Sequence, residues 1–303
     1  MKKLVVGLGE VLWDLLPGGK HLGGAPANFA YITTLLGDEG MVASRVGCDS
    51  LGDDVMAELR ALGLSTESVQ RDERHPTGVV RVEVDAKGCA QFEIEQPSAW
   101  DFLESTPEWA ALARAADAVC FGSLAQRSAI SRETIRRFLG QTRKDAIRIF
   151  DVNLRAPFYF PDILRESMQI ADIVKLNNEE MPEVMELLGQ AHADERSSAE
   201  KLIASFQLKL VCVTRGARGS FLVSDAGSHE QPAIAIEVVD TVGAGDAFTA
   251  ALVHEYLRGS SLATMNQVAN RIGAWVASRA GPTPRAQPGE LGNLLSGPHT
   301  SAY

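Results

Sequence analysis

The sequence predicts an α/β fold built on a mostly parallel central sheet, with a smaller β hairpin projecting from it. Beyond Pro107, short apolar runs alternate with helical patterns, which is the order typical of parallel sheets. Residues 77–94 instead alternate between apolar and polar side chains around a turn at Lys87 and Gly88, as in a hairpin with one polar face. No long linker, repeat or low-complexity tract divides the 303 residues. We therefore expect a single domain over residues 1–303.

The composition argues against several functional classes. An apolar content of 45% and a charged content of 22% are ordinary for a soluble globular protein. The net charge of −10 argues against a nucleic-acid partner, because such proteins usually present a basic face. The cysteines show no CxxC or other metal-binding spacing, and we expect Cys120 and Cys212 in the core. No apolar run is long enough for a secretory signal or a membrane span, so we expect a cytoplasmic protein without a membrane partner.

The N-terminal part begins the alternation of strands and helices. We expect strands over 4–7 and 41–47, and helices over 27–36 and 51–64. The first strand ends in G-L-G-E, which suggests a dinucleotide-binding turn. The third glycine of that fingerprint is missing, so we regard this alternative as weak.

The central part continues the same alternation. Apolar runs predict strands over 118–122, 147–150, 173–176 and 210–213, and helical spacing predicts helices over 132–138 and 268–277. The tail after Gln287 is rich in Gly, Ser and Pro, and we expect it to be a loose end.

The most informative stretch is D-T-V-G-A-G-D-A-F at 240–248. It follows an apolar run at 234–239, which predicts a strand, and it opens a helical pattern that ends at Gly259. We expect the N–H groups of Gly243, Ala244 and Gly245 to be free at this helix N-terminus, where they favour an anion. Asp246 could then accept the proton of an attacking hydroxyl beside a transferring phosphoryl group. The alternative is an ordinary helix start whose acidic residue favours the helix dipole.

Two motifs together resemble one family. D-T-V-G-A-G-D-A-F is similar to the C-terminal signature of the ribokinase-like sugar kinases, the PfkB family, and G-G-A-P-A-N at 23–28 is similar to its N-terminal sugar-binding signature. The resemblance runs from about Leu4 to about Pro284. It implies a ribokinase-like three-layer α/β/α fold and an ATP-dependent kinase. G-G-A-P-A-N and the D-x-N-x-R at 151–155 are most similar to fructokinases.

The resemblance also implies that the hairpin is part of a small β lid. The lid would be discontinuous, formed by residues 11–24 and 77–97, and would close over the sugar to exclude water. Its apolar sheet face could support a homodimer.

The sugar site follows from the first signature. The resemblance implies that Asp14 and Asn28 bind sugar hydroxyls beside Gly23 and Gly24, and a carboxylate and an amide suit a vicinal diol. Asp14 alone reads as a turn residue. Arg155 could hold an anionic or polyhydroxylated substrate, although a salt bridge is an equal alternative. Asp246, as the base, is the last of the residues expected to contact the sugar.

The nucleotide site is implied by motifs after the later strands. N-x-x-E at 177–180 resembles the family motif in which the glutamate organises Mg²⁺ and its waters, so Glu180 is the expected magnesium residue. Asn/Glu capping of a helix, and an ordinary turn at 214–219, are the alternatives. Asp240, with the segment 278–284, resembles a K⁺ site. The residues expected at ATP are Lys175, Asn177, Thr214, Gly216, Gly219, Gly245 and Asn270.

The sequence thus predicts ATP-dependent phosphorylation of a sugar primary hydroxyl, with fructose as the expected substrate and fructose 6-phosphate as the product. One alternative is a kinase of the same fold acting on 2-keto-3-deoxygluconate, ribose or a nucleoside. The other is a non-catalytic sugar-sensing protein, against which the intact G-A-G-D argues.

Overall fold

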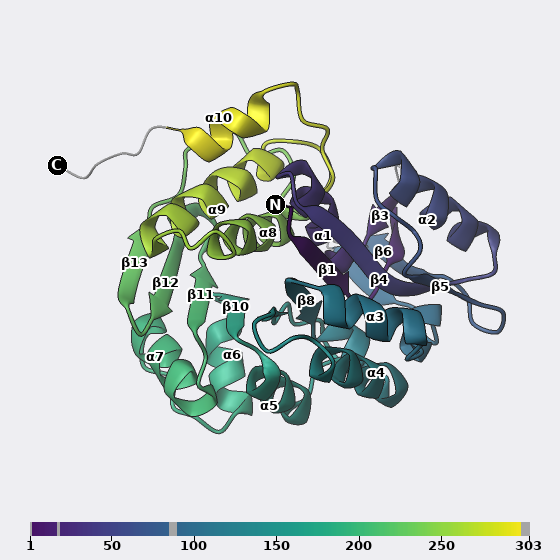
Figure 1. Ribbon diagram of the computed structural model, residues 1–303, viewed down its shortest axis with the longest axis horizontal. Coiled ribbons are helices and arrows are strands. Elements are labelled where there is room, and N and C mark those ends of the chain that lie inside the picture. The colour runs from purple at the N-terminus through teal and green to yellow at the C-terminus, as the bar shows by residue number, and fades with distance from the viewer. Residues whose placement is uncertain (1, 17–18, 85–89, 298–303) are drawn as a thin grey trace.

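The computed structural model describes residues 2–16, 19–84 and 90–297, and its main feature is a nine-stranded sheet (Figure 1). Neighbouring strands are parallel, except for two antiparallel pairs at one edge. The strand order is β13-β12-β11-β10-β9-β8-β1-β4-β5. This confirms the predicted fold class, and each predicted strand before residue 220 lies within an observed one. The strands are β1 (Leu4–Leu8), β4 (Glu39–Gly47), β5 (Val69–Asp72), β8 (Ala118–Gly122), β9 (Ile147–Asp151), β10 (Ile173–Asn177), β11 (Leu210–Thr214), β12 (Ser220–Ser224) and β13 (Gly227–Gln231).

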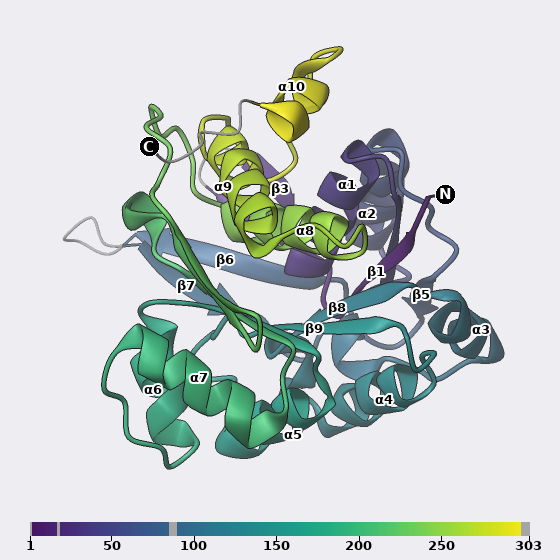
Figure 2. The same ribbon diagram turned by 60° about the vertical axis from the view of Figure 1, so that its left-hand side comes forward.

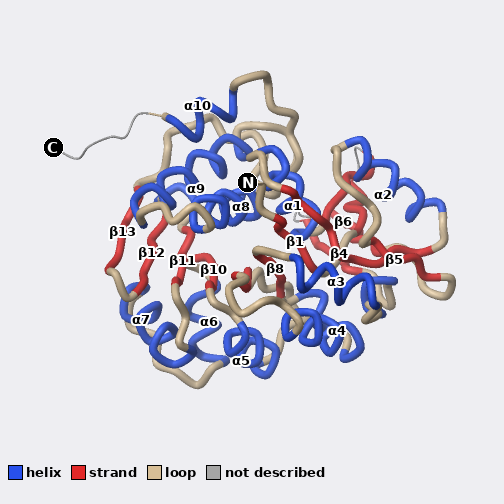
Figure 3. The backbone as a smooth tube through the Cα atoms, in the orientation of Figure 1, coloured by secondary structure: helices blue, strands red, loops and turns tan. Residues whose placement is uncertain are grey.

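Helices cover both faces of this sheet, as the colours of Figure 3 show. Successive residues of a strand point to opposite faces, and β1 illustrates the consequence. Val5 packs into a core with α1, α8 and α9, whereas Val6 packs into a second core with α3–α7 (Figure 2). The helices are α1 (Ala25–Leu35), α2 (Ser50–Ala61), α3 (Pro107–Ala115), α4 (Ala129–Gly140), α5 (Pro161–Ile170), α6 (Glu180–Leu187), α7 (Glu195–Phe206), α8 (Ala244–Tyr256), α9 (Leu262–Ala277) and α10 (Glu290–Ser296), with 3-10 turns at Ala99–Phe102, Leu124–Arg127 and Gly216–Arg218.

A second, four-stranded sheet has the order β3-β2-β6-β7. Its strands are β2 (Leu12–Leu16), β3 (Gly19–Gly23), β6 (Gly78–Val84) and β7 (Ala90–Ile94). β2 pairs with β3 in antiparallel fashion and with β6 in parallel fashion, so two segments far apart in the chain form one small sheet. β2 and β3 lie within residues 11–24, and β6 and β7 lie within residues 77–97, the two segments predicted to form the lid. The predicted turn at Lys87 and Gly88 lies outside the described residues.

The predicted strand at 234–239 is wrong. This segment forms no strand, and Val238 and Val239 are 59% and 60% exposed. Its last backbone N–H, that of Val239, donates to the carbonyl of Ala277 over 2.9 Å instead. The apolar alternation suits a strand, but the chain leaves the edge of the sheet at Pro232 to reach the end of α9.

The expected loose end after Gln287 is also wrong for residues 290–296, which form α10. Glu290 accepts hydrogen bonds from Trp275 Nε1 (2.9 Å) and Arg279 Nη2 (2.6 Å), which hold α10 against α9. Leu291, Leu294 and Leu295 also pack against the core at the i, i+3, i+4 spacing of a helix. This short apolar pattern was overlooked because Gly, Ser and Pro dominate the composition of the tail. Among the helices described, none is long and apolar enough to cross a membrane.

Candidate active site

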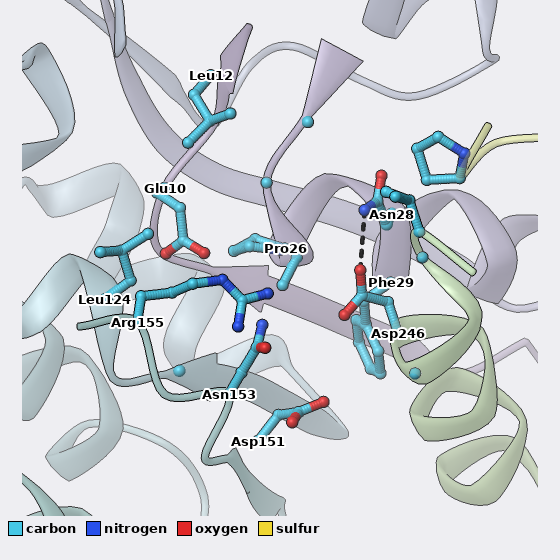
Figure 4. Close-up of a pocket in the computed structure, with 18 of the residues that line it drawn as sticks. Glu10, Leu12, Pro26, Asn28, Phe29, Leu124, Asp151, Asn153, Arg155 and Asp246 are labelled. Carbon is cyan, nitrogen blue, oxygen red and sulfur yellow. Dashed lines mark hydrogen bonds between the residues drawn. The ribbon is translucent and has the colours of Figure 1, made fainter. Parts of the chain in front are cut away.

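A cavity of about 970 Å³ lies at the carboxyl ends of β8–β11 (Figure 4). Open parallel sheets bind ligands at this edge. The small sheet forms the opposite wall through Leu12, Asp14, Val80 and Ile94. The cavity therefore brings together both sequence signatures, one from the start of α1 and one from the start of α8.

The turn before α8 presents backbone donors to this cavity. Gly243 caps the helix with φ +76°, and a Cβ there would come within 2.4 Å of Pro282 Cβ, so both conformation and space require glycine. The N–H of Ala244 donates to the carbonyl of Thr241 over 3.2 Å. Among the described residues, no acceptor takes the N–H groups of Gly243, Gly245 or Asp246. The predicted donor set therefore needs a correction, because Asp246 N–H is free where Ala244 N–H was expected.

Asp246 lies in the first turn of α8, directly after Gly243 and Gly245 with their free N–H groups. Asn28, in the first turn of α1, donates from Nδ2 to Asp246 Oδ2 over 2.8 Å (Figure 4). Burial and the charge of Asp151 raise the pKa of Asp246 to about 6, whereas the Asn28 hydrogen bond, Lys175 and Arg155 act in the opposite direction. A carboxylate with a pKa near neutrality is suited to accept a proton.

A buried ion pair between Lys175 and Asp151 lies beside the start of α8. Lys175 Nζ lies 3.0 and 3.2 Å from the two carboxylate oxygens of Asp151. Thr249 Oγ1, from α8, lies 2.9 Å from Asp151 Oδ2 and 2.9 Å from the carbonyl of Gly245. Burial alone lowers the pKa of Lys175, but the charges of Asp151, Glu180 and Asp246 raise it above its ordinary value. The ammonium group therefore stays charged.

Lys175 was predicted at ATP, and its position is compatible with a phosphate contact. A Cβ added to Gly245 would lie 3.1 Å from Lys175 Nζ, so the ammonium lies directly beside the predicted anion site. Asp151 and Thr249 are missing from the predicted site residues. Asp151 is the last residue of β9, so its position at the carboxyl end of a strand was the available signal.

The two glycines of the sugar signature lie too close to their neighbours to allow a side chain. A Cβ at Gly23 would lie 2.3 Å from Asp14 Oδ2, and one at Gly24 (φ +105°) would lie 2.5 Å from the carbonyl oxygen of Glu10. Asp14 lines the cavity from β2, and its pKa is raised by burial, against the charges of His21 and Arg155. The structure therefore brings Asp14, Gly23, Gly24 and Asn28 into one wall, as predicted.

Two further charged groups lie on the same side of the cavity. Arg155 is exposed and donates to the carbonyl of Leu154, and within the described residues it forms no ion pair. The predicted alternative of a salt bridge is therefore wrong. Glu10 is only 5% exposed, and burial raises its pKa to about 7. Glu10 is absent from the predicted site, although it lies two residues beyond the carboxyl end of β1, which was again the available signal.

The carboxylate of Glu180 is hydrogen-bonded to backbone N–H groups. Its two carboxylate oxygens accept the backbone N–H groups of Leu154 and Asn177, each over 2.8 Å. Asn177 Oδ1 in turn accepts the N–H groups of Glu179 and Glu180, which is a helix cap. Both oxygens of Glu180 are thus already hydrogen-bonded, which favours a contact with Mg²⁺ through water. In the described part of the chain, no cluster of three or more His, Cys, Asp or Glu side chains is arranged to hold a metal.

The residues predicted at the nucleotide fall into two groups. Asn177 and Thr214 line the cavity at the ends of β10 and β11. Gly216, Gly219 and Asn270 do not line it. A Cβ at Gly219 would lie 1.9 Å from the Gln231 carbonyl, which gives this glycine a packing role. Asn270 donates to Ser220 Oγ over 2.5 Å in a polar cluster between α9 and β12.

Asp240 ties the helix start to the segment after α9. Its Oδ1 accepts the N–H of Val242 over 2.9 Å, and its Oδ2 accepts the N–H of Gly281 over 3.1 Å. The structure therefore brings together the two segments predicted to hold K⁺. Both carboxylate oxygens are already hydrogen-bonded there.

Comparison with known proteins gives consistent matches. The sequence pattern of the pfkB family carbohydrate kinases matches residues 17–288. A fructokinase of Escherichia coli is 31% identical over an alignment of 283 positions, and the match covers 88% of each chain. A 2-dehydro-3-deoxygluconokinase of Thermoproteus tenax is 27% identical over 250 residues, 79% of this chain and 74% of its own.

A solved structure shows a similar fold. The fructokinase of Vibrio cholerae O395, in its fructose-, ADP- and calcium-bound form, gives a TM-score of 0.79 at 25% identity. The match covers 93% of this chain and 95% of that one.

Proposed function

This chain belongs to the pfkB family of carbohydrate kinases, with a ribokinase-like α/β fold, and we propose that it transfers the γ-phosphoryl group of ATP to the primary hydroxyl of D-fructose. The observation that supports this most directly is the junction of the two signatures. Asn28 of the sugar signature is hydrogen-bonded to Asp246, and Asp246 lies beside free N–H groups at the start of α8.

The transfer needs a base and an anion site. Asp246 takes the proton of the sugar hydroxyl, whose oxygen forms the new bond to phosphorus as the bond to the ADP oxygen breaks. The N–H groups of Gly243 and Gly245, with the helix dipole, face the negative charge on the phosphoryl group. With a pKa of about 6, Asp246 is mostly ionised at neutral pH and can accept the proton.

Metal ions would complete the nucleotide site. Mg²⁺ prefers oxygen ligands and retains water, so nucleotide phosphates can hold it with few protein ligands. The residues present fit this arrangement, because both carboxylate oxygens of Glu180 already accept a backbone N–H, which suits a contact with hydrated Mg²⁺ through water. Bound Mg²⁺ would neutralise phosphate charge. We propose K⁺ as an activator near Asp240, to be tested by replacing K⁺ with Na⁺ in the assay.

A sugar acid is the second candidate substrate, for a specific reason. Arg155 points into the cavity without an ion pair among the residues described, and a carboxylate would satisfy it. The relative from Thermoproteus tenax is named for such an acid. Arg155→Ala should then reduce turnover of sugar acids much more than turnover of neutral sugars.

The deciding experiment measures ADP release with Mg-ATP and K⁺ on a panel of acceptors. The panel contains fructose, ribose, 2-keto-3-deoxygluconate, adenosine, glucose and tagatose, with Asp246→Asn as the inactive control. Turnover of fructose above all others supports the proposal. If another acceptor is turned over instead, the proposed mechanism stands and only the proposed substrate changes. If no acceptor is turned over but sugar binding is retained, the result favours a sugar-sensing protein.

We also propose that the small sheet closes over the sugar and supports a homodimer. Light scattering at micromolar concentration tests the dimer, and a monomer there would contradict it.

A further inference from the structure

Glu10 is a buried carboxylate in the sugar half of the cavity. Its side chain is 5% exposed and lines the cavity, and its carbonyl oxygen lies directly behind Gly24 of the sugar signature. Its Oε2 has no hydrogen-bond partner among the described residues. An ionised carboxylate is costly to bury without donors, so this position is unfavourable for stability unless it serves a ligand.

Glu10 and Arg155 face the same part of the cavity. Figure 4 shows both on one side, opposite Asn28 and Asp246. The positive charge of Arg155 favours the ionised form of Glu10, although the two do not form an ion pair within 4.0 Å. The two residues therefore lie across the cavity from Asp246, the proposed base.

We propose that Glu10 is a specificity-determining residue, which offsets the charge of Arg155 so that the cavity favours a neutral polyhydroxyl sugar over a sugar acid. Hydroxyl groups can donate to Glu10 and accept from Arg155 at the same time. A carboxylate that approaches Arg155 must also approach Glu10, and like charges repel. This inference rests on the proposed function, because it names the class of sugar that the site selects.

Removing the charge of Glu10 tests the proposal. We expect Glu10→Gln to raise the ratio of kcat/KM for 2-keto-3-deoxygluconate to that for fructose at least about tenfold, the effect of one nearby charge. The matched control is Glu39→Gln, an exposed glutamate at the start of β4, which should leave the ratio unchanged. Arg155→Gln should lower the ratio. An unchanged ratio in a folded Glu10→Gln protein would overturn the proposal.

The pH dependence of the unmodified protein tests the same point without a substitution. The charged groups acting on Glu10 are Asp246 from α8, Arg155 from the loop after β9, and Arg127. Protonation of Glu10 as the pH falls from 8 to 6 should raise the acid-to-neutral ratio. Asp246 is present in the unmodified protein and in Glu10→Gln, so the same pH series on Glu10→Gln measures the contribution of Asp246 to the ratio. A flat ratio in this range would contradict the proposal.

Binding measurements separate this inference from the proposed function. If the unmodified protein turns over neither substrate, the proposed function fails. Calorimetric binding of D-fructose and D-gluconate to the protein and to Glu10→Gln then still decides the role of Glu10. A gain for D-gluconate in the variant supports the inference, and equal changes for both probes overturn it.

Discussion

Asn28 Nδ2 donates to Asp246 Oδ2 over 2.8 Å and so joins two residues that are 218 positions apart. The contact exists because the N-termini of α1 and α8 meet at the cavity, where these helices pack against each other. The group expected to bind the sugar is therefore bonded directly to the group expected to deprotonate it.

Asp246→Asn should abolish the chemistry and keep the binding. The amide cannot accept the hydroxyl proton, so kcat should fall by about 10²–10⁴-fold or more. It has nearly the same shape and can still accept from Asn28 through its oxygen. ADP release measures the loss, and calorimetry with the sugar measures the retained binding. Substantial residual turnover would show that another group removes the proton.

The pH profile should show an acidic limb that belongs to Asp246. The base must be ionised, so kcat should fall as the pH drops below the pKa of about 6. Asn28 stabilises the ionised form, so Asn28→Ala should raise this pKa and move the limb to higher pH. The control is Asn293→Ala on α10, which should leave the limb in place. Identical limbs in both variants would separate Asn28 from the titration.

Local sequence patterns predicted most of the fold. Strands buried on both faces, such as β1 and β8, give continuous apolar runs. A glycine that ends the helical pattern lies shortly after each of α1 and α8. The segment 234–239 has the same apolar character but forms no strand. A strand also needs a partner segment from elsewhere in the chain, and a local apolar pattern does not show whether that partner is present.

The site was predicted where short motifs specify it. Gly243, Asp246 and Asn28 belong to two signatures and meet as expected. Glu10 was missed because a single acidic residue after a strand carries no motif, and Asp151 was given no role although it begins the D-x-N-x-R motif. Their significance depends on burial and on neighbours from other strands, which only the fold supplies.

Asp151→Asn should destabilise the protein. Removing one partner of a buried pair leaves Lys175 without its main counter-charge, which costs about 3–5 kcal/mol in the free energy of unfolding. The control is Asp145→Asn, which breaks a surface pair with Arg143 and should cause no measurable change. Chemical denaturation compares the two. Equal stabilities would mean that Glu180 and Asp246 suffice to hold the ammonium group.

Gly243→Ala should damage the anion site more than the fold. Gly243 and Gly259 have similar positive φ values of +76° and +72°, so alanine causes similar backbone strain of about 1–2 kcal/mol at each. They differ in space, because a Cβ at Gly243 would meet Pro282 at 2.4 Å, whereas one at Gly259 would meet nothing within 4 Å. The turn at Gly243 must therefore shift and displace the N–H donors beside Asp246. We expect kcat to fall by about 10²-fold for Gly243→Ala, since misplacement by about 1 Å has an effect of this size.

The control is Gly259→Ala, which should lower the melting temperature and leave kcat unchanged. An equal loss of kcat in both variants would assign the effect to stability rather than to the anion site.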